Sequence, residues 1–122
     1  MEVVDNVCTL APYFKISDEN METFKKLGGE LIEKTKSEKD CIYYSFTMSG
    51  NEALCREGYT SAAAILNHLE NVAALLGEVL QIAEITRFEV HGPKGQLDIL
   101  RKNLAELNPQ YFELIGGFNR IG

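Results

Sequence analysis

Residues 41–72 read CIYYSFTMSGNEALCREGYTSAAAILNHLENV, and this stretch decides the fold because it joins two strands and a helix without a break. Alternating apolar side chains predict strands over residues 41–48 and 53–59, and the Gly-Asn pair between them is typical of a hairpin turn. Over residues 61–76 apolar side chains recur every three or four positions, which predicts a helix. The apolar face of this helix carries one titratable ring, His68.

The residues before this unit predict one more strand and one more helix. Residues 7–16 have apolar side chains on both faces of a strand, although Pro12 donates no ladder hydrogen bond and indicates a bulge or the end of regular pairing. Ser17-Asp18-Glu19 can cap a helix, since a hydroxyl or carboxylate accepts from free amides and acids suit the helix dipole. The small-to-apolar stripe of this helix runs from Met21 to Thr35 and includes Gly28.

A fourth strand follows over residues 81–92, where strict alternation places Phe88 on one face and Ile85 on the other. The order is then βαββαβ, the ferredoxin-like arrangement of an α+β fold, in which helices cover only one face of the sheet. Apolar residues such as Val7, Ile42 and Phe88 make the uncovered face apolar in this interpretation. A homodimer through that face is therefore predicted.

Residues 1–93 form the predicted ferredoxin-like domain, and residues 94–122 form an extension with one helix and one strand. Leucines are in line over residues 96–107, which predicts the helix, and residues 111–115 read as the strand. The extension packs either on the same domain or on the dimer partner.

Composition excludes several classes of function. The chain has 122 residues and a formal net charge of −6, so it repels phosphate backbones, and nucleic-acid binding is not expected. It has no apolar run near the ~18 residues of a membrane span, and its start lacks the pattern of a signal peptide. The three cysteines are odd in number and have no CxxC spacing, which favours reduced thiols in a cytoplasmic protein.

His68 supports two interpretations. It points at the sheet or at a pocket, because small and apolar residues such as Ala64, Ile65 and Val72 surround it on the helix. It is then either a buried histidine satisfied by a neighbour such as Glu57 or a tyrosine, or a general base whose ordinary pKa suits proton abstraction.

Three segments resemble the antibiotic biosynthesis monooxygenase domain family. They are Cys41-Ile-Tyr-Tyr44, then Arg56-Glu-Gly-Tyr59, then Ala64 with His68-Leu-Glu-Asn-Val72. The resemblance covers roughly residues 7–92 and implies a dimeric α+β barrel, in which each half encloses a pocket between sheet and helices. Some members oxidise quinols, anthrones or similar phenols without flavin, metal or haem; others degrade haem, and many have no known activity. The tail resembles the extension of one bacterial subgroup.

One departure from the family narrows the expectation. The chain has no tryptophan, whereas the haem-degrading branch and some anthrone oxygenases place one in the pocket. A cofactor-independent monooxygenase for a quinol- or anthrone-like aromatic molecule is the first hypothesis, with no cofactor expected. A non-catalytic small-molecule-binding or assembly protein on the same scaffold is the second, and a haem-binding protein with His68 as axial ligand is the third.

The candidate catalytic residues are His68, Tyr44 and Glu57, where Tyr44 can donate to a substrate oxygen and Glu57 can orient His68 or pair with Arg87. Each also has a structural interpretation, as a core aromatic or a paired carboxylate. The candidate substrate-binding residues are Phe24, Leu27, Tyr59, Asn71 and Arg87. Two histidines without acids at ligand spacing predict no metal site.

Overall fold

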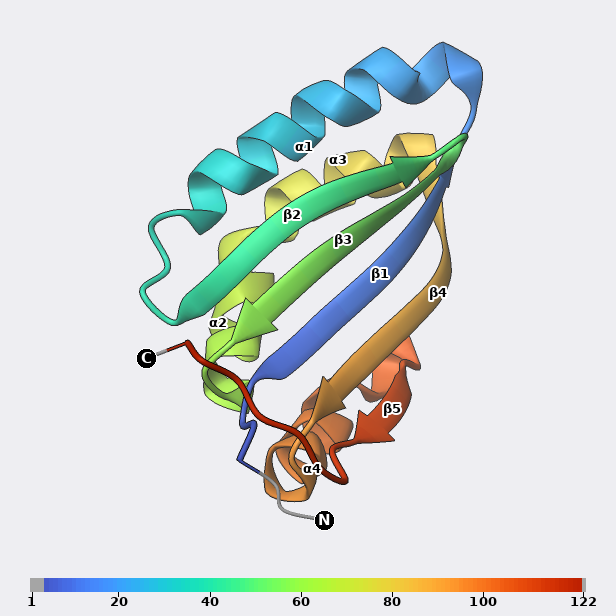
Figure 1. The fold of residues 1–122 in the computed structure, drawn as a ribbon. Coiled ribbons are helices and arrows are strands. Elements are labelled where there is room, and N and C mark those ends of the chain that lie inside the picture. Colours follow the sequence, from blue (N-terminus) through green and yellow to red (C-terminus); the bar gives the residue numbers. More distant parts are fainter. Residues whose placement is uncertain (1–3, 122) are drawn as a thin grey trace.

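A computed structural model describes residues 4–121. In chain order the elements are β1 (Cys8–Ile16), the short 3-10 helix η1 (Asp18–Asn20), α1 (Met21–Thr35), β2 (Cys41–Ser49), β3 (Glu52–Tyr59), α2 (Ala62–Asn71), α3 (Ala73–Ile82), β4 (Ala83–Gly92), α4 (Lys94–Asn103), η2 (Ala105–Leu107) and β5 (Gln110–Glu113). The strands form one five-stranded sheet in the order β2-β3-β1-β4-β5 (Figure 1). All neighbours are antiparallel except β4 and β5. The predicted ferredoxin-like α+β fold is confirmed.

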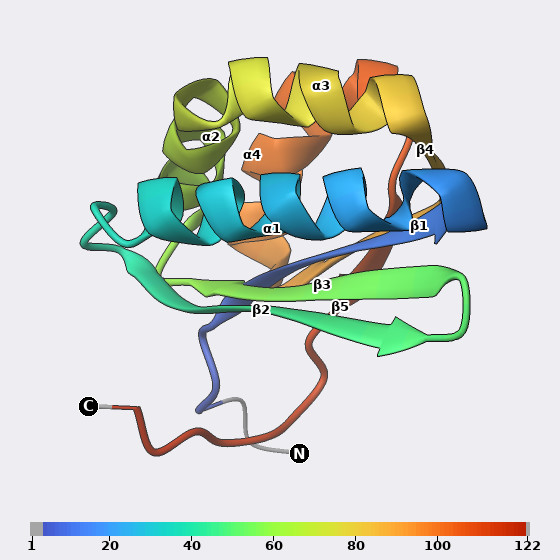
Figure 2. The same ribbon diagram turned by 90° about the horizontal axis from the view of Figure 1, so that it is seen from above.

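The four α-helices all lie on one face of the sheet, and within residues 4–121 only the two terminal segments lie on the other side (Figure 2). Two apolar clusters fill the layer between helices and sheet. One joins Tyr59 and Val90 of the sheet to α2 and α4, and the other joins Phe14 and Cys55 to α1 and α3. The candidate site lies where these two clusters meet.

The predicted helix over residues 61–76 is two helices with a junction at Val72. Ser61 caps the first, because its hydroxyl oxygen accepts from the backbone N–H of Ala64 at 3.1 Å. The second continues to Ile82, so β4 begins two residues later than the sequence indicated. The junction keeps the apolar faces of both helices on the sheet, and Val72 itself is buried.

Pro12 lies inside a central strand, and the sheet is irregular next to it. The register between β1 and β4 shifts between Tyr13 and Phe14, which is the bulge that Pro12 indicated. This bulge adds a residue to β4, so Ile85 and Phe88 both face the helices and line one cavity. Strict alternation was wrong in placing these two side chains on opposite faces.

The uncovered sheet face is more polar than the sequence predicted. Phe88 lies on the helix side. The open face has half-buried Tyr43 and Leu54, together with exposed Arg56 and Arg87. The ring of Tyr43 covers Gly58, where a β-carbon would overlap it.

The C-terminal residues pack on the same chain. Leu97 and Leu100 of α4 are buried against α2, and β5 adds a parallel strand to the edge of the sheet. The chain then runs back to the N-terminal segment, where Val4 N–H donates to the carbonyl of Gly117 at 3.1 Å. Phe118 on this last segment is 63% exposed.

Two glycines test this packing. Gly29 lies in α1 with open space where its β-carbon would be, so Gly29→Ala should raise the free energy of unfolding by up to about 1 kcal/mol. Gly58→Ala should lower it by about 1–3 kcal/mol, because the Tyr43 ring must move. Urea unfolding of both variants measures this, and equal effects would contradict the described packing.

Candidate functional site

A cavity of about 70 Å³ lies between the sheet and helices α2 and α3. Its walls are almost entirely apolar, and the half-exposed Leu80 and Leu107 lie at its mouth. The polar side chains that reach it are Tyr44, Glu57 and His68. The apolar lining comes from Leu10, Pro12, Phe14, Phe46, Ile85 and Phe88 of the sheet and from Leu31, Leu69, Val72 and Leu76 of the helices.

Glu57 is the buried carboxyl group of the site. It lies on the helix-facing side of β3, between Cys55 and Tyr59, and is 3% exposed. The Tyr59 hydroxyl donates to its Oε1 at 2.6 Å. Burial raises the pKa of Glu57 to about 8, while hydrogen bonds from Tyr59 and Cys55 oppose that rise. At neutral pH Glu57 therefore carries a proton.

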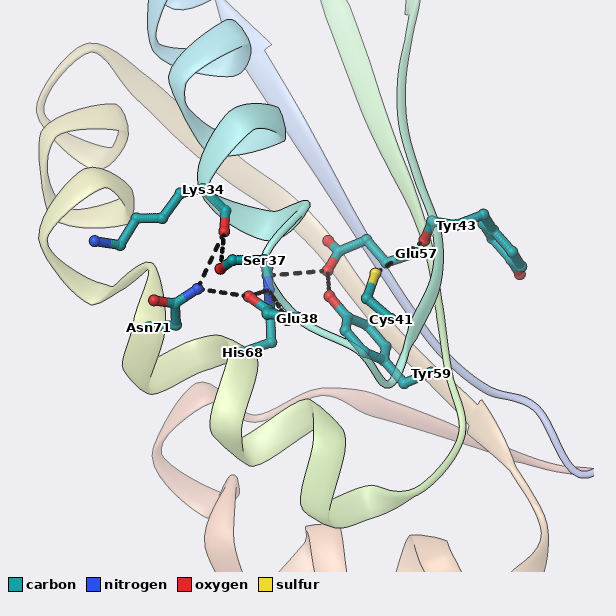
Figure 3. Close-up of polar contacts among 9 residues, drawn as sticks. All are labelled: Lys34, Ser37, Glu38, Cys41, Tyr43, Glu57, Tyr59, His68 and Asn71. Carbon is teal, nitrogen blue, oxygen red and sulfur yellow. Dashed lines mark hydrogen bonds and ion pairs between the residues drawn. The ribbon is translucent and has the colours of Figure 1, made fainter.

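His68 extends from α2 toward Glu57 and is 2% exposed (Figure 3). Its Nδ1 lies 2.9 Å from Oε2 of Glu38, and its Nε2 lies 3.4 Å from Oε1 of Glu57. Burial lowers the pKa of His68, and the contact with Glu38 offsets only part of that effect. The ring is therefore neutral at pH 7, with Nδ1 beside Glu38 and Nε2 beside Glu57 on the cavity side.

Glu38 is the residue of this cluster that the sequence did not reveal. It lies in the loop between α1 and β2, and its side chain is 5% exposed. Asn71 donates to its Oε2 at 2.8 Å. A polar groove borders it on the side away from the cavity, lined by Ser37, Lys39, Asp40, Asn67 and Glu70 as well. The loop has two acids, Glu38 and Asp40, and no spacing distinguishes the one that turns inward.

Tyr44 completes the group of side chains that the fold brings together. Its ring centroid lies 5.3 Å from that of His68, and the ring of Tyr59 lies 5.2 Å from His68 on the other side. Burial strongly raises the pKa of Tyr44, with the charge of Glu57 adding to the effect. Its hydroxyl is therefore a hydrogen-bond donor throughout the physiological pH range.

The other predicted substrate-binding residues lie elsewhere. Phe24 and Leu27 belong to the apolar cluster between α1 and the sheet, outside the cavity lining. Asn71 lines the polar groove and donates to Glu38, so its link to the cavity residues is indirect, through Glu38. Arg87 pairs with Glu89 and does not approach Glu57. The aromatic lining residues Phe14, Phe46 and Phe88 were missed because an apolar strand face looks the same whether it meets a core or a cavity.

The three cysteines show no feature of a reactive thiol. All three are free, and burial raises the pKa of Cys8 and of Cys41 to about 11. Among residues 4–121, His, Cys, Asp and Glu side chains form no group suited to a metal ion. In the same range, the helices are too short or too polar to cross a bilayer.

Comparison with solved structures defines the class of protein. An antibiotic biosynthesis monooxygenase shares the fold at a TM-score of 0.59 and 21% identity, covering 69% of this chain and 92% of that one. A protein of Bacteroides thetaiotaomicron, described as a possible oxidoreductase, matches at a TM-score of 0.65 and 20% identity, covering 71% and 97%. The chain thus has the antibiotic biosynthesis monooxygenase-like fold, which confirms the resemblance noted in the sequence.

A closer likeness fixes the family. MupZ from Pseudomonas fluorescens is 45% identical, with a TM-score of 0.91 over 95% of this chain and 96% of its own. The chain belongs to one family with MupZ, and the match extends through most of the C-terminal extension. No family model matches the chain, and no curated protein matches its sequence.

The protonation of Glu57 generates a prediction on stability. Its pKa in the folded protein, about 8, lies above the 4.5 of an exposed glutamate, so the folded state binds the extra proton. This contribution to stability is complete below pH ~4.5 and is lost as the pH rises through ~8. Between pH ~6.5 and ~8.5 the wild-type protein should lose roughly 2 kcal/mol of unfolding free energy relative to Glu57→Gln, which cannot ionise.

Chemical denaturation of both proteins across this range measures the difference. Because the cysteines have raised pKa values, they also contribute to the pH dependence of stability, and this contribution cancels when the two proteins are compared. His68 acts in the opposite direction and only at lower pH, because its pKa is lowered. Parallel pH profiles of the two proteins would show that Glu57 is ionised in the folded state.

Proposed function

We propose that the protein is a cofactor-independent enzyme that uses acid–base catalysis on a largely apolar small molecule. One observation carries the proposal: a neutral imidazole, His68, and a protonated carboxyl group, Glu57, face each other at 3.4 Å in the wall of an apolar cavity. Neighbouring titratable groups whose pKa values are displaced in opposite directions are the arrangement of an acid and a base. The cavity excludes water from the proton that they exchange with a substrate.

The reaction that we propose is oxygenation of a quinol- or anthrone-like aromatic molecule. His68 Nε2 takes a proton from the phenolic hydroxyl of a quinol or from the methylene carbon of an anthrone, and the resulting anion donates an electron pair from a ring carbon to dioxygen, forming a carbon–oxygen bond. Glu57 protonates the peroxide. The Glu57 carboxylate then removes the second proton from the same carbon, which forms the carbonyl and breaks the oxygen–oxygen bond. The departing hydroxide takes the proton held by His68, so one dioxygen yields one carbonyl and one water.

The cavity suits this substrate class in two respects. Its aromatic residues Phe14, Phe46 and Phe88 offer flat apolar surfaces, and Tyr44 can donate to the oxygen of a phenolate or carbonyl. The structural relatives described as a monooxygenase and a possible oxidoreductase share only the fold, and their names add support for the reaction class without identifying a substrate.

A second candidate is a proton-transfer reaction that consumes no oxygen. The proton on Glu57 favours it, because isomerisation and the addition or elimination of water need an acid beside a base, whereas deprotonation before oxygenation needs only the base. Haem ligation gains no support from the geometry, since both nitrogens of His68 face carboxyl groups. A non-catalytic binding protein is the remaining alternative.

Replacing the base tests catalysis. His68→Gln should lower turnover of an oxidisable phenol or anthrone by about 10²-fold or more, the scale of a lost acid–base group. Oxygen uptake and product formation measured together separate the two reactions, because product formed without oxygen uptake supports the second candidate. A matched control is His91→Gln, which changes the histidine that pairs with Glu89 outside the cavity.

Measuring the stability of the same preparations tests the alternative that His68 has only a structural role. If His68 only fills the core, His68→Gln should lower stability by about 1–3 kcal/mol through an unsatisfied buried partner and leave turnover per folded molecule unchanged. That result would contradict the proposed role of His68 as the base, whereas a wild-type protein without any turnover would favour the binding protein.

We also propose that the enzyme is a cytoplasmic homodimer that binds no nucleic acid. Free thiols and the net charge of −6 support the location and the lack of nucleic-acid binding. The sheet face without helices supports the dimer, because half-buried Tyr13, Tyr43 and Leu54 extend from it.

The dimer proposal is tested by mass. Leu54→Arg places a charge on the open face and should convert the dimer to a monomer in light scattering at micromolar concentration. Ile99→Arg, on the exposed side of α4, is the matched control and should keep the dimer mass. A monomeric wild-type protein would refute the proposal.

A further inference from the structure

The contacts of His68 indicate a role for Glu38, a residue of the loop before β2. We propose that Glu38 is the positioning residue of the site: it holds the His68 ring with the proton on Nδ1, so that Nε2 is the basic nitrogen on the cavity side. The catalytic consequence rests on the proposed function, whereas the state of the ring does not.

The contact between Glu38 and His68 is close and shielded from water. Both carboxylate oxygens lie within hydrogen-bond distance of Nδ1, at 3.1 Å for Oε1 and 2.9 Å for Oε2. The two side chains are only 3% and 5% exposed. Asn71, one turn beyond His68, donates to Oε2 at 2.8 Å and fixes the carboxylate from behind (Figure 3). Asn71 is therefore a donor to Glu38, and the carboxylate offers acceptor atoms to His68.

The opposite tautomer is disfavoured by the same geometry. A proton on Nε2 would leave the lone pair of Nδ1 facing two carboxylate oxygens in a buried place, with no hydrogen between them. The other titratable groups around the ring are Glu57 and Tyr59 on β3 and Tyr44 on β2. Of these, only Glu57 lies near a ring nitrogen, and a protonated Glu57 can donate toward Nε2 but cannot replace the acceptor at Nδ1.

Glu38 also connects the base with solvent. His68 lines the apolar cavity, whereas Glu38 lines the polar groove on the opposite side, beside Asp40 and Glu70. When His68 takes a proton, the imidazolium is stabilised by the carboxylate at Nδ1. The groove then offers a route by which protons exchange with water while a substrate fills the cavity.

The experiment observes the ring directly, with ¹⁵N-histidine NMR on the wild-type protein, Glu38→Gln and Glu70→Gln. Glu70 is the matched control because it lines the same groove, carries the same charge and makes no contact with His68. In the wild-type protein, the His68 ring should be neutral at pH 7 with hydrogen on Nδ1. In Glu38→Gln, the pH at which His68 titrates should move lower, because the carboxylate that favours the imidazolium is gone; in Glu70→Gln it should not move.

The outcomes separate this inference from the proposed function. Hydrogen on Nε2 in the wild-type protein, or a titration of His68 that is the same in all three proteins, would overturn the role of Glu38 even if His68→Gln abolished turnover. If the ring behaves as expected but His68→Gln keeps full turnover, the proposed function fails and the positioning of the ring stands. Where a turnover assay exists, Glu38→Gln should lower kcat by about 10²-fold at unchanged KM, and Glu70→Gln should leave both unchanged.

Discussion

Burial of the Glu57 carboxyl group is the constraint on which the site depends. The alternation of β3 directs residues 53, 55, 57 and 59 toward the helices, so Glu57 enters a layer that is mostly apolar. An ionised carboxylate there would cost several kcal/mol, so the group holds its proton and accepts from Tyr59. His68 tolerates the same burial by staying neutral, because burial lowers its pKa more than the contact with Glu38 raises it.

Glu57 and His68 lie between the two apolar clusters that fill the layer. One apolar cluster lies on the α2–α4 side and another on the α1–α3 side, and the residues that separate them are Glu57 on the sheet and His68 on α2. The bulge beside Pro12 and the helix junction at Val72 both border the cavity, since Pro12 and Val72 are among its lining residues.

Much of this arrangement could be predicted from periodicity, and the rest could not for definite reasons. The order of elements along the chain and the hairpin follow from local periodicity, as do the inward direction of His68 and the shared face of Cys55, Glu57 and Tyr59. Glu38 could not be found, because a loop carries no period and its contact with His68 spans 30 residues. The bulge in β4 could not be located from the sequence for a related reason. One added residue reverses the face of every residue that follows it in the strand, and only Pro12, on the neighbouring strand, indicated an irregularity.

The C-terminal extension is part of the site as well as of the fold. Leu107 follows α4, is 49% exposed and lines the mouth of the cavity opposite Leu80 of α3. One residue of the extension therefore contributes to the cavity lining. The likeness to MupZ runs across this boundary, whereas the relatives that share only the fold match about 70% of the chain. The mouth of the cavity is therefore built partly from the extension, whereas Glu57 and His68 lie deeper in the layer.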